Sequence, residues 1–241
     1  MQCLTLLKFG GSVLAALNPD LYASLKALID VTNHHNEEEC RDYLQYAKYK
    51  LFRDFRIVNL IHFDAEYRLT SGDADVAISG RIREEDGREY NRAYVWELKA
   101  AQVAIFKKET NNRFIPTLEL IKAENQLLHY YLEAKGNQDF RMAFGITDEN
   151  EVRLGGIIIS TDERKIELSD IAVDRAEILY DKARRARNEL YGSTGIRLLT
   201  WDRVLEHLRT PTIGGTQTSS TVQVFQTQTI PAGTISIDTP Q

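Results

Sequence analysis

Residues 72–78 read Gly-Asp-Ala-Asp-Val-Ala-Ile, and residues 93–99 read Ala-Tyr-Val-Trp-Glu-Leu-Lys. In both stretches apolar side chains recur at every second position, which is the period of a β-strand. The pair Asp86-Gly87 lies between them, and such pairs close tight antiparallel hairpins. The sequence therefore predicts two neighbouring antiparallel strands here, and this hairpin decides how the rest of the chain is interpreted.

Charged side chains cluster at one end of the predicted hairpin. Glu97 and Lys99 are two residues apart, so they point to the same face of their strand, while Trp96 and Leu98 point to the other. In a regular hairpin, Asp75 at the start of one strand lies across from the end of the next. We therefore expect Asp75, Glu97 and Lys99 to converge.

These residue types suit phosphodiester hydrolysis. The carboxylates of Asp75 and Glu97 and the backbone carbonyl of Leu98 are hard oxygen ligands suited to Mg²⁺ or Mn²⁺. A neighbouring ammonium group, that of Lys99, can orient a metal-bound water or stabilise a pentacovalent phosphate. The alternative is an ordinary surface ion pair, since an acid two residues before a lysine is common by chance.

The remaining pattern alternates between helical and extended periods. We expect helices at Leu21–Ile29, Glu37–Phe52, Pro116–Ala134, Ser169–Leu190 and Trp201–Leu208. We expect strands at Ile57–Ile61, Ala74–Ile82, Ala93–Leu98, Phe140–Thr147, Val152–Ser160 and Ile196–Thr200. Because the first strands join by hairpins, the fold class is an α/β sandwich with a mixed sheet rather than a doubly wound parallel sheet.

Length and composition bound the class of protein. The chain has 241 residues and a net charge of -5, which argues against coating nucleic acid by bulk positive charge. Its two cysteines, Cys3 and Cys40, cannot form a disulfide framework and point to a reducing compartment. No stretch has the length of a membrane span, and the first residues lack a basic leader region. We therefore expect a cytoplasmic protein with no membrane partner.

The acidic motif resembles that of the PD-(D/E)xK nuclease superfamily. Asp75 matches its first acid, with Ala74 where proline often stands, and Glu97-Leu98-Lys99 matches its (D/E)xK strand. Many members carry a glutamine followed four residues later by tyrosine on the next helix, which Gln126 and Tyr130 match. The resemblance implies a restriction-endonuclease-like sandwich with a central mixed β-sheet flanked by helices, catalytic roles for Asp75, Glu97, Lys99 and Gln126, and DNA as substrate.

Within that superfamily the chain looks most like the Shedu type of anti-phage defence nuclease. The stretch 195–205, with Thr200-Trp201-Asp202 at its centre, resembles the closing strand and helix of that group. The resemblance covers residues 37–209 and implies a Mg²⁺-dependent DNA endonuclease that acts against foreign DNA as a homo-oligomer. Two alternatives stay open: a non-catalytic nucleic-acid-binding or scaffold protein on a nuclease fold, and a housekeeping repair or recombination nuclease.

The chain divides into three segments by composition. Residues 1–36 form an N-terminal helical segment, residues 37–209 the nuclease domain, and residues 210–241 a tail rich in Thr, Ser and Gln. Such a tail cannot bury enough apolar surface to fold alone, so it is disordered or, through residues 221–225, adds a strand to the sheet edge of a partner.

Several further residues are candidates for the site. Asp73 points the same way as Asp75 and can replace or assist it as a metal ligand. Glu38 or Glu39, in the first turn of the helix that begins at Glu37, can supply an additional acid.

Candidate DNA contacts lie after the metal strand. Lys107, Lys108 and Arg113 are expected in a polar loop where they can touch DNA phosphates, with Tyr130 as a further DNA contact. A solvated loop without function is the alternative for the three basic residues.

Overall fold

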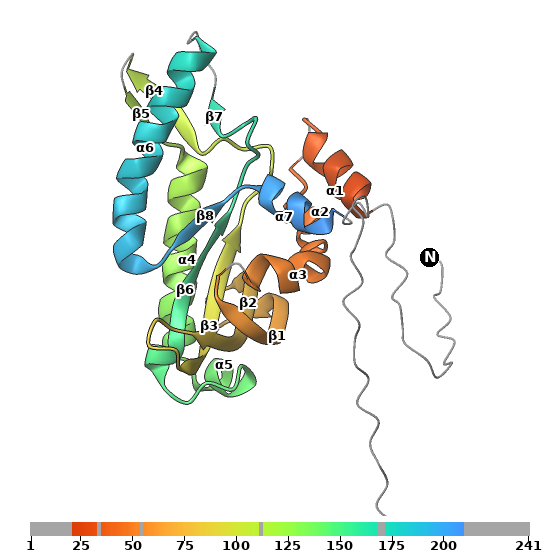
Figure 1. The fold of residues 1–241 in the computed structure, drawn as a ribbon, viewed down its shortest axis with the longest axis vertical. Coiled ribbons are helices and arrows are strands. Elements are labelled where there is room, and N and C mark those ends of the chain that lie inside the picture. The colour runs from red at the N-terminus through yellow and green to blue at the C-terminus, as the bar shows by residue number, and fades with distance from the viewer. Residues whose placement is uncertain (1–20, 33–34, 54, 111–112, 168–171, 210–241) are drawn as a thin grey trace, which may run out of the picture. The chain divides into compact units, whose positions relative to one another are not determined.

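A five-stranded mixed sheet in the order β1-β2-β3-β6-β8 forms the centre of the structure (Figure 1). This computed structural model describes residues 21–32, 35–53, 55–110, 113–167 and 172–209, which all belong to one compact unit. The five strands are β1 (Ile57–Arg68), β2 (Asp73–Arg83), β3 (Glu89–Leu98), β6 (Val152–Ile158) and β8 (Arg197–Leu199). A smaller sheet has the order β5-β4-β7, with β4 (Phe106–Thr110), β5 (Arg113–Pro116) and β7 (Ile166–Glu167).

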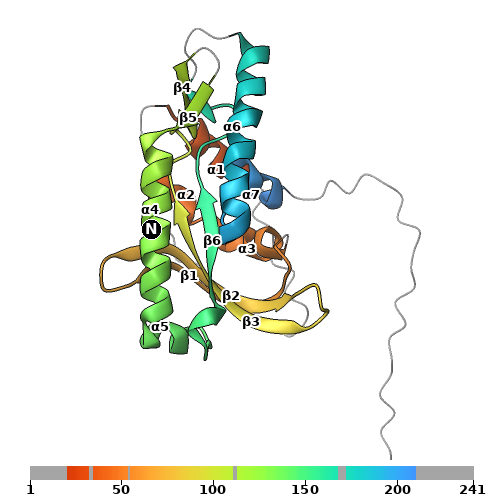
Figure 2. The same ribbon diagram turned by 90° about the vertical axis from the view of Figure 1, so that its left-hand side faces the viewer.

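Helices cover both faces of the large sheet (Figures 1 and 2). The helices are α1 (Leu21–Asp30), α2 (Glu37–Arg41), α3 (Leu44–Arg53), α4 (Leu118–Gly136), α5 (Gln138–Ala143), α6 (Val173–Thr194) and α7 (Trp201–Leu208), with the 3₁₀ turn η1 at Glu149–Glu151. Apolar residues of α4, α5 and α6 pack on one face of the sheet. Those of α1, α2, α3 and α7 pack on the other. The expected α/β fold with a mixed sheet flanked by helices is therefore confirmed.

The central hairpin forms where the sequence predicts it. Strands β2 and β3 pair antiparallel with Val76 opposite Trp96, and Gly87 in the connecting turn has φ of 79°. Trp96 and Leu98 are buried in the cluster formed with α1, α3 and α7. Val95 is buried in the cluster on the α4 face. Strand β3 then pairs with β6 in parallel, and β6 with β8 in parallel, which makes the sheet mixed.

Two predicted elements are wrong. The stretch Phe140–Thr147, predicted as a strand, contains the end of α5, whose first turn is capped when the Asn137 side chain accepts the N–H of Phe140. Phe140 and Phe144 are four residues apart, so they share a helical face, and their rings stack at 4.6 Å. The predicted helix Glu37–Phe52 is interrupted at Asp42 and Tyr43, where the Tyr43 N–H bonds the carbonyl of Cys40 three residues back.

The region after β3 also differs from the prediction. Lys107, Lys108 and Arg113 lie in the paired strands β4 and β5 rather than in a polar loop. Phe106 of β4 and Phe114 of β5 both bury their rings, so these two strands are part of the core. Pro116 ends β5 instead of starting the following helix. That helix is α4, which begins after Thr117, whose side chain accepts the N–H of Leu120.

The structure describes the predicted helix near the N-terminus but not the C-terminal tail. Leu25 and Ile29 of α1 are buried in the same cluster as residues of α3 and α7, so α1 is part of the compact unit. The tail, residues 210–241, lies outside the described residues. None of the helices in the described ranges is long and apolar enough to cross a membrane.

Candidate metal and active site

The charged residues of the motif meet at the C-terminal end of β3. The N–H of Leu98 donates to Asp75 Oδ2 at 2.7 Å, which ties β2 to β3 beyond their last backbone pair. Lys99 Nζ donates to Glu97 Oε1 at 2.6 Å and to the Leu98 carbonyl at 2.8 Å. The negative charge of Asp75 also acts on the Glu97 carboxyl. Asp75, Glu97, Leu98 and Lys99 are therefore one connected group.

Glu97 is the most buried member of this group. It is 1% exposed, and its Oε2 has no hydrogen-bond partner within the described part of the chain. Burial raises the pKa of Glu97 to about 8, and repulsion from Asp75 adds to the shift, while Lys99 opposes it. Burial likewise raises the pKa of Asp75, although the bond from the Leu98 N–H lowers it. The charged forms of Asp75 and Glu97 are therefore disfavoured, because the surrounding groups do not compensate two negative charges.

Lys99 is charged despite its burial. Loss of water alone lowers the pKa of the Lys99 ammonium, but Glu97, Glu37 and Asp75 outweigh this and raise the pKa above its ordinary value. A hydrogen bond from the Trp201 indole to the Lys99 carbonyl, 2.8 Å long, fixes the backbone at this position. Trp201 is part of the closing motif that the sequence singled out.

Of the three glutamates that begin α2, Glu37 lies nearest the group, rather than the expected Glu38 or Glu39. Glu37 lies in the first turn of α2 with Oε2 3.9 Å from Lys99 Nζ. Burial raises the pKa of Glu37 to about 7, although Lys99 lowers it. Glu38 and Glu39 are exposed. Because the three glutamates are consecutive, only the placement of α2 decides which one faces β3, and the sequence carried no signal for that choice.

Asp73 lies apart from the group. It is the first residue of β2, and its exposed carboxyl is 3.9 Å from Arg68 Nε on the neighbouring strand β1. Arg41, which sequence reasoning missed, lies closer: its charge lowers the pKa of Asp75, and its guanidinium forms an ion pair of 3.2 Å with Glu66. The candidates from α2 are therefore Glu37 and Arg41.

Helix α4 supplies the predicted glutamine and tyrosine. Burial, together with the charges of Glu97 and Asp75, raises the pKa of the Tyr130 hydroxyl, while Gln126, one turn earlier on α4, is exposed. Tyr130 packs on the cluster that contains Val95, so it lies on the α4 side of the sheet, the side to which Glu97 points. Gly72, just before β2, has φ of +154°, and a Cβ there would lie 3.1 Å from the Tyr130 hydroxyl oxygen. A glycine at this position lets the start of β2 approach α4.

The same helix holds the turn that precedes β2. The Glu133 carboxylate accepts hydrogen bonds from the N–H groups of Thr70 and Ser71 and from the Ser71 hydroxyl. His129 Nε2 is 2.7 Å from the Ser71 Oγ. These bonds lower the pKa of Glu133 although partial burial acts in the opposite direction. One face of α4 therefore both contributes Tyr130 to the site and fixes the strand that carries Asp75.

The predicted DNA contacts lie on the small sheet. Arg113 forms an ion pair with Glu109, its neighbour on the paired strand, while Lys107 is exposed.

Helix α6 is tied to α4 because Arg187 and the Tyr191 hydroxyl both bond the Glu124 carboxylate.

The donor set fits a divalent cation. Among the described residues no three His, Cys, Asp or Glu side chains gather as a metal-binding group. The side-chain ligands would therefore be the carboxylates of Asp75 and Glu97, with the Leu98 carbonyl as a backbone ligand. Mg²⁺ usually keeps several waters and takes only one or two carboxylates, so this set suits it. Among the described residues Glu97 Oε2 has no hydrogen-bond partner, so a bound cation would stabilise this atom most. Comparison with models of known protein families and with curated proteins gave no match.

Proposed function

We propose that this chain is a metal-dependent DNA endonuclease with a restriction-endonuclease-like core of the PD-(D/E)xK type. The observation that carries the proposal is the buried Glu97, whose Oε2 has no hydrogen-bond partner among the described residues although it lies beside Asp75 and the Lys99 ammonium. An apolar core gains nothing from two adjacent buried acids, because their mutual repulsion opposes folding. A site that receives a cation accounts for them.

Each residue has a distinct role in this proposal. Asp75, Glu97 and the Leu98 carbonyl would hold Mg²⁺ or Mn²⁺, which when bound polarises a phosphate oxygen and activates a water for attack. The Lys99 ammonium, held by Glu97, would stabilise the negative charge that develops on the phosphate in the transition state. Gln126 and Tyr130 lie on the α4 side of the site and would position the scissile phosphate.

The biological setting follows from the resemblance of the motif and of the closing strand and helix to Shedu-type nucleases. We propose that the enzyme acts on phage or other foreign DNA in the cytoplasm and works as a homo-oligomer. A duplex is longer than this single unit is wide, and a second copy would extend the surface that contacts phosphates. Lys107 and Lys108 are proposed as contacts to the DNA backbone.

Cleavage of supercoiled plasmid DNA tests the function. The wild type is expected to cut in Mg²⁺ and to be inactive in excess EDTA, and Glu97→Gln is expected to be inactive in Mg²⁺. Asp73→Asn is the matched control, because it removes an exposed carboxylate two residues from Asp75. Full activity in EDTA, or in Glu97→Gln, would contradict the proposal. A metal-independent protein that binds the plasmid without cutting it would support the scaffold alternative instead.

A further inference from the structure

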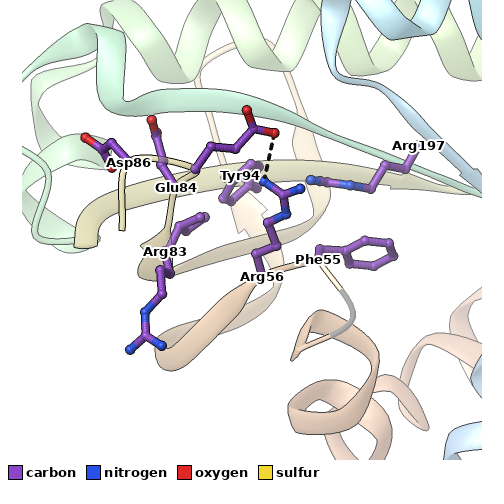
Figure 3. A pocket seen from close by; sticks show the side chains of 9 residues that line it. Phe55, Arg56, Arg83, Glu84, Asp86, Tyr94 and Arg197 are labelled. Carbon is purple, nitrogen blue, oxygen red and sulfur yellow. Dashed lines mark hydrogen bonds and ion pairs between the residues drawn. The ribbon is translucent and has the colours of Figure 1, made fainter. Parts of the chain in front are cut away.

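A pocket of about 650 Å³ lies on the α3 side of the sheet, away from the acidic group (Figure 3). Its lining comes from the turn before β1, the end of β2, the hairpin turn, β3 and β8, and it includes Phe55, Arg56, Glu84, Asp86, Tyr94 and Arg197. Tyr94 packs in the same cluster as Trp96, on the face of β3 opposite to Val95. The pocket is therefore separate from the candidate metal site.

Arg197 is the unusual member of the lining. Its guanidinium stacks 4.6 Å from the ring centre of Phe55 and 5.7 Å from that of Tyr94. Both rings lie near the guanidinium, whose N–H groups belong to the lining of the pocket (Figure 3). Within the described part of the chain, those N–H groups have neither a hydrogen bond nor an ion pair.

This arrangement leaves a cation partly dehydrated without a counter-ion. Loss of water lowers the pKa of Arg197 from its ordinary value, and only Tyr94 acts against the shift. Removing water from a guanidinium costs free energy unless an anion or several acceptors replace it. The stacking contacts recover part of that cost. They do not satisfy the five N–H donors, which in other sites bind carboxylates and phosphates.

Arg56 adds a second guanidinium to the same pocket. Its side chain points into the pocket, where it forms an ion pair of 3.5 Å with the exposed Glu85 (Figure 3). Exposed pairs of this kind are weak, so an incoming anion can compete for Arg56. The Arg56 backbone has φ of 65°, a conformation that glycine or asparagine adopts at lower cost. An arginine in this backbone conformation presents a charged side chain to the pocket at the expense of local strain.

Three acidic residues lie at the rim of the pocket. Glu84 pairs with Arg92 at 3.1 Å, and Asp86 accepts a hydrogen bond from the Tyr90 hydroxyl, so neither neutralises Arg197. Glu85 pairs with Arg56, so the rim carboxylates are already compensated, and they offer acceptors to the polar groups of a ligand rather than a net negative charge. A small anion can pass the rim, and its own N–H or O–H groups can bond the rim carboxylates. The pocket volume lies in the range of small-ligand sites and exceeds the size of a free phosphate ion.

We propose that this pocket binds a small organic phosphate of the size of a mononucleotide, with its phosphate group held by Arg197 and Arg56 and its polar end near Glu84 and Asp86. The site is independent of the proposed nuclease activity, because none of its residues belongs to the metal group. Its occupation would join β8 to the start of β1.

Calorimetric titration of the full chain in EDTA, without DNA, tests the proposal. The probes are a mixture of the four ribonucleoside 5′-monophosphates, inorganic phosphate alone, and a short single-stranded oligonucleotide. We expect the monophosphates to bind in the millimolar range or tighter, and more tightly than inorganic phosphate. The oligonucleotide is expected to bind through Arg197 no better than the monophosphates do. Undetectable binding of the monophosphates would overturn the proposal, and so would an Arg197-dependent preference for the oligonucleotide.

Variants locate the binding. Arg197→Gln is expected to weaken monophosphate binding by about tenfold or more, since charge-assisted hydrogen bonds are lost. Arg203→Gln on α7, outside the pocket, is the matched control and should bind as the wild type does. Glu85→Gln releases Arg56 from its ion pair and should tighten binding, which keeps the test decisive if Arg197→Gln fails to fold. Unchanged affinity in both Arg197→Gln and Glu85→Gln would overturn the assignment.

Discussion

At the scale of single residues, Lys99 and the acids that surround it have different roles in the proposed site. Lys99→Ala removes an ammonium that donates to Glu97 but that would not ligate a cation. We therefore expect cleavage to slow by about a thousandfold, as when one donor to a developing anion is lost. Mg²⁺ affinity, measured by calorimetry, should be unchanged or higher, because a like charge has been removed. A loss of Mg²⁺ affinity as large as that of Glu97→Gln would contradict this assignment.

The raised pKa values predict how stability depends on pH. With the pKa of Glu97 at about 8 and that of Glu37 at about 7, the folded protein binds more protons than the unfolded chain between about pH 5 and 8. The free energy of unfolding of the metal-free protein should therefore fall by several kcal/mol as pH rises through this window. Urea unfolding at several pH values measures it.

Glu97→Gln separates this effect from other titrations. The glutamine cannot ionise, so the pH dependence of unfolding should become shallower than in the wild type. Added Mg²⁺ should restore wild-type stability at pH 8 and leave the variant unchanged, because it binds the folded state only where both carboxylates are present. An equally steep pH dependence in Glu97→Gln would show that this acid is not the group responsible.

At the scale of elements, helix α4 holds the strand that carries Asp75. Glu133→Ala removes the acceptor of the Thr70 and Ser71 N–H groups at the turn before β2. We expect the free energy of unfolding to fall by about 1 kcal/mol and cleavage to slow, with Mg²⁺ binding weakened as Asp75 loses its fixed position. Lys122→Ala, on an exposed turn of the same helix where it pairs with Glu119, is the control and should leave both quantities unchanged. Wild-type cleavage in Glu133→Ala would contradict the role of this anchor.

The elements also show what the sequence could predict. The β2–β3 hairpin is local: its alternation and the Asp86-Gly87 turn lie within one stretch of chain, so both the strands and the convergence of Asp75 with Glu97 could be read directly. The stretch that forms the end of α5 predicts a strand because its short apolar run fits both periods, and the Asn137 cap and the Phe140–Phe144 stack favour the helix.

Contacts between distant elements account for the other omissions. Glu37 joins Lys99 only because α2 packs near the end of β3, which no property of three consecutive glutamates indicates. Arg197 reads in the sequence as one more charged residue of a short strand. Its place between Phe55 and Tyr94 depends on β8 pairing with β6 and on the approach of the α3–β1 connection.

At the scale of the whole molecule, the compact unit ends at Thr210. Truncation after Arg209 should therefore leave the melting temperature of the protein unchanged within about 2 °C. If the tail adds a strand to a partner, as its alternation allows, light scattering of the truncated chain will show fewer copies per assembly than in the wild type. The same mass and the same cleavage rate would mean that the tail plays no part in assembly.

The central claim is that the buried acidic pair holds a divalent cation that cleaves DNA, and a Mg²⁺ titration of single-turnover plasmid cleavage tests it most directly. Asp75→Asn is the variant of choice, because its side-chain oxygen can still accept the Leu98 N–H and so preserve the hairpin. The account predicts that the wild-type rate rises with Mg²⁺ from zero in EDTA to a plateau, and that Asp75→Asn does not cleave at any Mg²⁺ concentration. Cleavage by Asp75→Asn at the wild-type rate, or wild-type cleavage that does not depend on Mg²⁺, would contradict it.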